Sequence, residues 1–126
     1  MISAKETSVV IGGFKFALYP VENEKIQKHV QKTMDLLLKN NLIPEIEMNR
    51  LLNDKDYCYK TFGINWNKNK FSLLTKDRSL APQRYWATNY AGYYICSQWY
   101  QNLTEKFADW LIYLAEETKN TNHHKD

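Results

Sequence analysis

Cysteine, histidine, proline and glycine are all scarce in this chain: its 126 residues include two, three, three and four of them. The two cysteines, Cys58 and Cys96, have neither metal-binding nor redox spacing. No run approaches the ~18 apolar residues of a membrane span, and the first residues lack the apolar stretch of an export signal. We therefore expect a cytoplasmic protein with two reduced, buried thiols and no membrane association.

The residues needed for catalysis are also missing from the positions where they would be expected. A restriction-type nuclease needs an acidic residue and then, on a strand, a carboxylate and a lysine in Glu-x-Lys spacing. The strand candidates contain no such triplet, and the nearest run, 22–25, opens a helix. His29 is the only histidine outside the tail, and Gly12-Gly13 lacks the Lys-Ser/Thr of a phosphate-binding loop. Paired zinc-ligand spacings are absent, and a metal contact at His123-His124 would be adventitious. We expect a non-catalytic protein without metal or cofactor.

Basic and aromatic residues are abundant in one part of the chain. The stretch from Lys55 to Tyr100 holds 12 of the 18 aromatic residues. Seven of the 17 basic residues lie between Lys55 and Arg84, where only Asp56 and Asp77 oppose them, so this segment carries +5 and the remainder −2. Such asymmetry predicts a contact surface for a polyanion, although the overall pI of 8.8 is below the ~9 of dedicated nucleic-acid domains. The alternative is that polar loops simply collect lysine and asparagine.

Hydrophobic periodicity predicts one α+β domain over residues 1–117, followed by a disordered tail, 118–126. Residues 8–19 read as a β-hairpin with a Gly-Gly turn. Helices are predicted over 21–39, 44–52 and 54–62. The second would turn four apolar residues inward: Ile46, Met48, Leu51 and Leu52.

Strands are predicted over 70–75, 83–88 and 92–97, the last two as a C-terminal β-hairpin. A final helix with an acidic outer side follows Asn102. Helices followed by a hairpin and a helix favour a winged-helix-like fold, although any helical hairpin would give the same pattern for 44–62.

A family resemblance covers most of residues 8–115 and begins with GGFKFALYPVENEKIQKHVQKTMDLLLKNN (12–41), a strand followed by an amphipathic helix. LLNDKDYCYKTFGINWNKNKFSLL (51–74), followed by RYW and GYYICSQWYQNLTEKFADWL (92–111), resembles a small accessory module of bacterial restriction and phage-defence proteins. DKDYCYKTFGI and YYICSQWY are the most specific parts, whereas the Asn/Lys-rich residues 65–70 depart from the pattern. The resemblance implies an accessory role in DNA or subunit contact and supplies no catalytic residues.

The basic segment supplies the candidate site. Its cations would contact phosphates, with Arg78 or Arg84 reaching a groove, while Tyr57, Trp66 and Tyr90 would lie against sugars or bases. Trp66 lies among polar residues and is expected to be exposed. Other large rings are expected in the core: Phe62, Trp86, Trp99, Phe107 and Trp110. The residues predicted to contact DNA are Lys55, Lys60, Trp66, Lys68, Lys70, Lys76, Arg78 and Arg84.

A second hypothesis is a protein-interaction module, either an accessory subunit or a mobile-element inhibitor of a defence nuclease. Exposed Trp, Tyr and Arg are also enriched at protein interfaces. The acidic last helix would then be the working face, as a DNA mimic or a docking surface. Both hypotheses remain open from the sequence.

Overall fold

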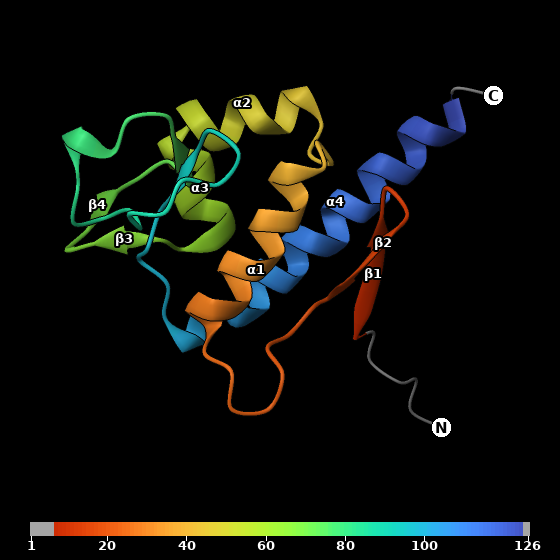
Figure 1. Ribbon diagram of the computed structural model, residues 1–126, viewed down its shortest axis with the longest axis horizontal. Coiled ribbons are helices and arrows are strands. Elements are labelled where there is room, and N and C mark those ends of the chain that lie inside the picture. The colour runs from red at the N-terminus through yellow and green to blue at the C-terminus, as the bar shows by residue number, and fades with distance from the viewer. Residues whose placement is uncertain (1–6, 125–126) are drawn as a thin grey trace.

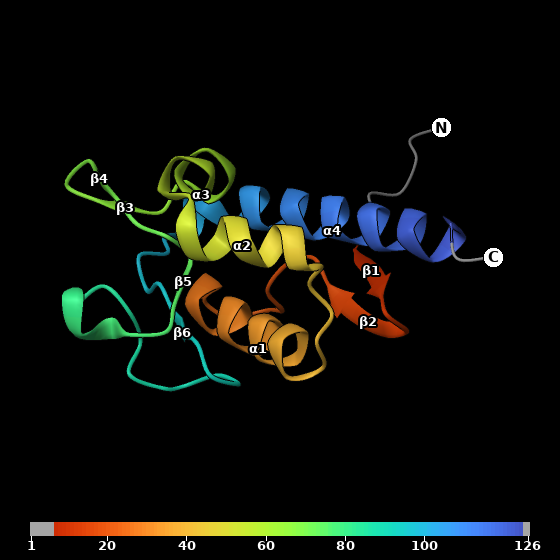
Figure 2. The same cartoon turned by 90° about the horizontal axis from the view of Figure 1, so that it is seen from above.

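The computed structural model describes the backbone of residues 7–124 and the side chains of residues 7–119. The described residues form a mixed α+β fold with four α-helices and three two-stranded antiparallel sheets. The long helix α4 (Thr104–His124) runs along one side of the molecule, and α1 (Ile26–Lys39), α2 (Glu45–Asn53) and α3 (Lys55–Phe62) gather beside it (Figures 1 and 2).

The predicted N-terminal hairpin is confirmed. Strands β1 (Ser8–Ile11) and β2 (Phe14–Ala17) pair antiparallel, with Val9 opposite Phe16. Gly12 and Gly13 both have positive φ, as a tight two-residue hairpin turn requires. Phe16 is buried, and β1 packs against α4. This hairpin is therefore part of the core.

Helix α1 begins five residues later than predicted. Val21 O accepts a hydrogen bond from Glu24 N, and Asn23 adopts φ +67°, so residues 21–24 form a turn. The first helical amide, Ile26 N, donates to Gln101 Oε1 at 2.7 Å. A side chain 75 residues away in the sequence thus satisfies the start of this helix, which local sequence patterns could not show.

Helices α2 and α3 follow their local signals. Pro44 precedes the first turn of α2, and the Asp54 side chain caps α3 by accepting from Tyr57 N at 2.9 Å. Gly63 ends α3 in the left-handed conformation, with φ +79°. The predicted boundaries of both helices are correct to within one residue.

The prediction that Ile46 faces inward is wrong, because its side chain is 71% exposed. Its neighbour Glu47 is buried instead, at 3% exposure. Position 47 lies one helical turn before Leu51 and so shares its inward face, whereas Ile46 lies on the side of Arg50. Polar partners described below make the burial of this carboxylate possible.

The C-terminal half contains shorter strands than predicted. Strands β3 (Asn65–Trp66) and β4 (Asn69–Lys70) form one hairpin, and β5 (Leu74–Thr75) pairs with β6 (Tyr94–Ile95). Residues 83–88 form no strand; they meet 92–97 through the single bridge Tyr85↔Cys96 and two backbone hydrogen bonds. The winged-helix-like arrangement is not confirmed, because β6 pairs with β5 and not with the predicted strand 83–88.

Rings fill the centre of the molecule, as predicted. Phe62 makes edge contacts with Trp99 and Trp110, at ring-centroid distances of 5.6 and 5.2 Å. Phe107 packs on both tryptophans. Of the five rings assigned to the core, only Trp86 is half-buried, at its edge.

The short 3₁₀ turn η2 (Gln101–Leu103) leads into α4, which continues to His124. A disordered tail was predicted from Thr118, whereas the backbone of residues 118–124 belongs to α4. The Thr118 hydroxyl donates a hydrogen bond to Leu114 O, one turn earlier, at 3.0 Å. Residues 125–126, and the side chains of His123 and His124, lie outside the described part. None of the described helices is long and apolar enough to cross a membrane.

Candidate nucleic-acid interface

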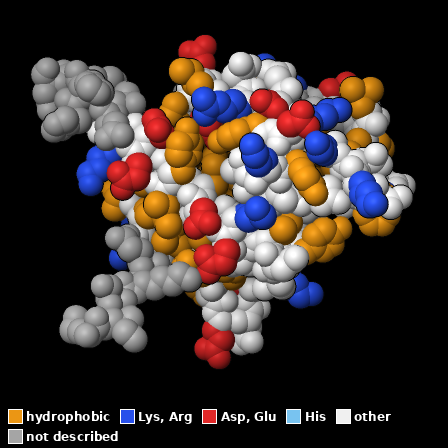
Figure 3. Space-filling view, turned by 180° about the vertical axis from the view of Figure 1, so that it is seen from behind, with side chains coloured by type: hydrophobic (Ala, Val, Ile, Leu, Met, Phe, Trp, Pro, Cys, Tyr) orange, Lys and Arg blue, Asp and Glu red, His pale blue; other side chains and the backbone are white. Residues whose placement is uncertain are grey.

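The residues predicted to contact DNA gather toward one end of the molecule. The β3–β4 hairpin and the 3₁₀ turn η1 (Arg78–Leu80, green) both project at the end opposite to β1–β2 (Figures 1 and 2). On the face seen from behind, Lys and Arg side chains predominate on the half that carries this end, and Asp and Glu on the other (Figure 3). The charge asymmetry of the sequence is thus also an asymmetry in space.

The β3–β4 hairpin divides these residues between two sides. Asn65 pairs with Lys70, and Trp66 pairs with Asn69. Because cross-strand partners share a face and successive residues alternate, Lys70 and Trp66 lie on opposite faces of the hairpin. The predicted residues therefore do not form one continuous surface.

The Lys70 side is turned toward α3. Lys70 Nζ lies 2.8 Å from the Asp56 carboxylate and 5.3 Å from the centroid of the Tyr59 ring. The hydrogen bond from Lys70 lowers the pKa of the Asp56 carboxyl. Since this pair is exposed, it mainly orients the hairpin and adds little stability. It also offsets the positive charge of Lys70, which makes this lysine a weaker phosphate contact.

The other side carries a stacked pair that joins two predicted residues. The guanidinium carbon of Arg84 lies 4.0 Å from the centroid of the Trp66 ring. Trp66 is 46% exposed, as predicted, and is not among the hydrophobic residues packed on the core. The structure therefore brings together the most exposed tryptophan and a cation from a segment 18 residues further along.

The remaining predicted cations differ in their exposure and in their contacts. Lys55, Lys60 and Lys68 are exposed, Lys68 in the β3–β4 turn. Lys76 Nζ lies 6.0 Å from the Tyr93 ring, and Arg78 is tethered through Nη2 to Pro82 O at 2.5 Å. Arg78 is thus partly committed to its own loop.

Tyr57 is not placed to contact a nucleic acid through its hydroxyl. That hydroxyl donates to the buried Glu47 carboxylate at 2.6 Å. Burial, together with this hydrogen bond, raises the pKa of Tyr57. Tyr90 is half-buried and bridges to Tyr93 through backbone hydrogen bonds of 2.7 and 3.0 Å. Of the three rings suggested for base or sugar contact, Trp66 alone is strongly exposed.

The network around Glu47 was not found from the sequence. Besides Tyr57, its carboxylate accepts hydrogen bonds from Trp110 Nε1 at 2.7 Å and from Arg50 at 3.1 Å. Arg50 also donates to the Tyr113 hydroxyl at 3.2 Å. Three donors satisfy this buried charge and join α2, α3 and α4. The sequence signal that could have located this network is the four-residue spacing of Glu47 and Leu51, which places both on the buried face of α2.

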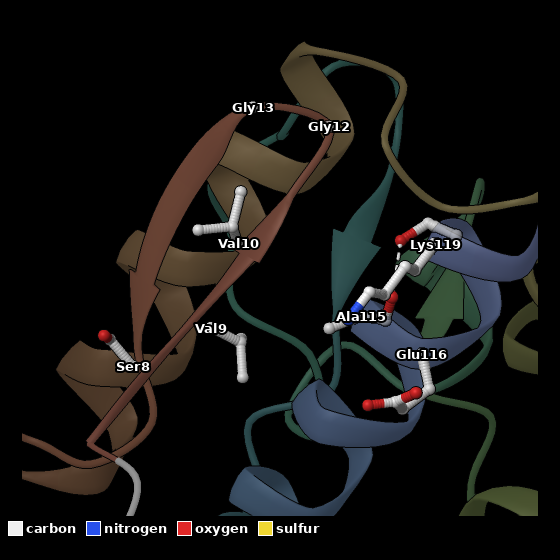
Figure 4. Close-up of a pocket in the computed structure, with 9 residues that line it drawn as sticks. Ser8, Val9, Val10, Gly12, Gly13, Ala115, Glu116 and Lys119 are labelled. Carbon is white, nitrogen blue, oxygen red and sulfur yellow. Dashed lines mark hydrogen bonds between the residues drawn. The ribbon is translucent and has the colours of Figure 1, made fainter. Parts of the chain in front are cut away.

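Other hollows carry no evident chemistry. One of about 480 Å³ lies between β1 and the last turns of α4, where Val9 points toward α4 and Val10 away from it (Figure 4). Burial raises the pKa of Cys58 and of Cys96 to about 12, so neither is a ready nucleophile. Among the described side chains, no three His, Cys, Asp or Glu residues gather as metal ligands.

Comparisons of the chain with protein-family models, with curated proteins and with solved structures find no match.

Proposed function

We propose that this protein is a non-catalytic DNA-binding module. The proposed contacts lie at the basic end of the molecule, which we define by the eight residues Lys55, Lys60, Trp66, Lys68, Lys70, Lys76, Arg78 and Arg84. One observation carries the proposal most: the Trp66 ring is held by Arg84 outside the core, on a projecting hairpin. The resemblance to accessory modules of restriction and phage-defence proteins adds the proposal that such contact serves a larger defence assembly.

The electrostatics of the basic end favour a phosphate backbone as ligand. Two acids oppose seven cations in this segment. The Asp56 carboxylate is paired with Lys70, and Asp77 caps η1 by accepting from Ser79 N at 3.0 Å. Lysines that approach phosphates release bound counterions, so affinity falls as salt rises, with a slope of about 0.9 per contact on duplex DNA.

Fluorescence anisotropy with labelled duplex and single-stranded DNA tests this directly. With about four phosphate contacts, affinity should fall about 100-fold between about 50 and about 200 mM salt. An RNA strand of the same length shows whether the sugar matters. Absence of binding to every nucleic acid, even at the lower salt, would sink the proposal.

A matched pair of triple variants locates the contact. Both remove three exposed lysines, so the change in net charge is the same. The test variant removes lysines of the basic end: Lys60→Ala, Lys68→Ala and Lys76→Ala. The control removes lysines from β2 and the start of α1: Lys15→Ala, Lys25→Ala and Lys28→Ala. The test variant should lower the salt slope by about two to three, and the control should leave it unchanged. Equal losses would mean diffuse attraction rather than a site.

A different surface favours the protein-interaction alternative. Hollows of about 310 and 260 Å³ lie beside Tyr113 at the junction of α4 with α3 and α2. Ile46, the most exposed apolar residue of α2, lines the second hollow. Such an exposed apolar side chain beside a charged helix suits a protein interface. An Ile46→Asp variant should abolish co-purification of a subunit co-expressed from a neighbouring gene and leave DNA affinity intact; unchanged co-purification would count against this surface.

A further inference from the structure

The Trp66 indole is exposed on one side only. Its other side is covered by the Arg84 guanidinium, 4.0 Å from the ring centroid. Trp66 is nevertheless 46% exposed as a residue, so we assign its exposed ring area to the uncovered face and the edges. The other three tryptophans differ: Trp99 and Trp110 are buried, and Trp86 packs against the core. Trp66 therefore presents one open aromatic face to solvent.

Local structure fixes the position of this face. Asn67 and Lys68 adopt φ +50° and +70°, which forms a tight turn directly after the ring. Asn65 Nδ2 donates to Gly63 O at 3.0 Å, which ties β3 to the end of α3. On the opposite face, the Lys70–Asp56 pair holds the hairpin against α3. The indole is therefore positioned before any ligand arrives.

Arg84 is anchored as well. Its backbone amide donates to Ala81 O at 3.0 Å, and its carbonyl accepts from Ser97 N at 2.9 Å. A planar guanidinium stacked on an indole restricts tilting of the ring and keeps a positive charge next to it. Arg84 thus supports the platform from behind while its charge remains available to a nearby phosphate.

We infer that the Trp66–Arg84 stack is a platform for an unpaired nucleobase, so that the basic end takes single-stranded nucleic acid in preference to duplex. This rests on the proposed function. In a duplex, neighbouring base pairs cover both faces of each base, whereas an unpaired base can stack on an aromatic ring. Lys68, in the turn that directly follows the ring, is an exposed cation for a flanking phosphate. The site would accept any base, because every base offers a flat face.

Anisotropy and tryptophan fluorescence with one set of ligands test the inference. The probes are an oligothymidylate of about 15 nucleotides, an oligouridylate of equal length and a duplex of equal length. The wild-type protein should bind the better single strand at least about tenfold more tightly than the duplex, with quenching of its fluorescence. Trp66→Ala should remove this preference, since stacking contributes about five- to 150-fold per base.

Arg84→Lys separates stacking from charge. Lysine keeps the positive charge but loses the planar stack, so the single-strand preference should fall while the salt slope stays the same. Trp66→Phe provides a smaller ring if Trp66→Ala folds poorly, and it should retain part of the preference. Circular dichroism confirms that each variant is folded.

The outcomes separate the two proposals. Binding to single strands that depends on Trp66 supports both. Salt-sensitive binding of duplex and single strands with equal affinity, unchanged by Trp66→Ala, overturns the platform and leaves the proposed function standing. Binding to no probe overturns both. Stronger binding of oligouridylate than of oligothymidylate keeps the platform and replaces DNA by RNA as the ligand.

Discussion

Two β-hairpins within residues 7–124, β1–β2 and β3–β4, have the same kind of tight turn but different surroundings. Both β1–β2 and β3–β4 reverse through two residues with positive φ, Gly12-Gly13 and Asn67-Lys68. The first hairpin buries Ile11 and Phe16 and packs against α4. The second buries none of its strand residues, and it projects from the other end of the molecule (Figure 1).

This difference separates residues that hold the fold together from residues that the fold displays. A hairpin that buries no apolar side chain gains little hydrophobic free energy, and an isolated two-stranded ribbon is marginal in water. The β3–β4 hairpin is held instead by its turn, by Lys70–Asp56 and by Trp66–Arg84. These contacts hold the hairpin in place without burying its side chains, so its residues are available to a ligand rather than used to support the core.

The largest expected contrast is between the aromatic residues of the two hairpins. Phe16→Ala should lower the free energy of unfolding by about 3–5 kcal/mol, because it leaves a cavity in the core. Trp66→Ala should lower it by less than about 1 kcal/mol, since only the exposed stack is lost. Urea unfolding followed by circular dichroism measures both. Comparable losses would show that the projecting hairpin also supports the fold.

Substitutions in the two hairpin turns should differ in their effect on stability by a smaller amount. A Cβ added at Gly12 would collide with Leu42 Cδ2, so the end of that side chain must shift, and the φ of +58° adds strain; Gly12→Ala should therefore cost about 1–3 kcal/mol. Asn67→Gly should change stability by less than about 0.5 kcal/mol, because glycine accepts φ +50° readily. Gly13→Ala is the matched control: the strain is similar, but no atom lies within 4 Å of the added Cβ. Equal losses of unfolding free energy for Gly12→Ala and Gly13→Ala would show that the contact with Leu42 does not contribute.

The packed part of the molecule should also determine the response to mild acid. His29 is buried against Phe107, and burial lowers its pKa from the ordinary 6.5. Below about pH 6.5 the unfolded chain binds a proton there that the folded protein does not. Stability should thus be constant above that pH and decline below it, by at most about 1.4 kcal/mol per pH unit, until the depressed pKa is reached.

His29→Gln is the control for this effect, and it should reduce the dependence of stability on pH between about pH 6.5 and 5. The hydrogen bond from Lys32 lowers the pKa of Glu24 below its ordinary 4.5, so this neighbour titrates only at lower pH. Thermal unfolding at closely spaced pH values gives the answer. An unchanged slope in the variant would assign the acid sensitivity to other groups.

The smallest effect is expected at the exposed pair that fixes the second hairpin to α3. Lys70→Ala should leave the melting temperature unchanged, because the ion pair is solvent-exposed. The Asp56 carboxylate would then titrate nearer its ordinary pKa, since Lys70 is what lowers it. NMR titration of Asp56 detects this change. A clear fall in melting temperature would contradict the view that this contact orients the hairpin without stabilising the fold.

Elements set by local chemistry were predictable from the sequence. The Gly12-Gly13 turn, the Asp54 cap and the Gly63 end of α3 each follow from the conformational preference of one or two residues. Trp66 was predicted to be exposed from its polar neighbours, and it is. The sequence could not pair it with Arg84, because that contact depends on how the chain returns after η1.

Elements set by distant partners were not predictable in the same way. Gln101 accepts a hydrogen bond from the first amide of α1. Leu74–Thr75 pairs with Tyr94–Ile95, which was the predicted partner of residues 83–88. Glu47 is buried because Tyr57 and Trp110 meet it from other helices. In each case a side chain or strand far along the sequence outweighs the local pattern.

The most direct measurement compares stability and nucleic-acid affinity in one double variant, Trp66→Ala with Arg84→Ala. If the projecting hairpin displays a binding platform, the melting temperature should stay within about 4 °C of wild type, which corresponds to a loss of about 1 kcal/mol. In the same variant, affinity for a single-stranded oligonucleotide should fall at least about tenfold. A lowered melting temperature with unchanged affinity would contradict the account, because Trp66 and Arg84 would then belong to the fold and not to a binding surface.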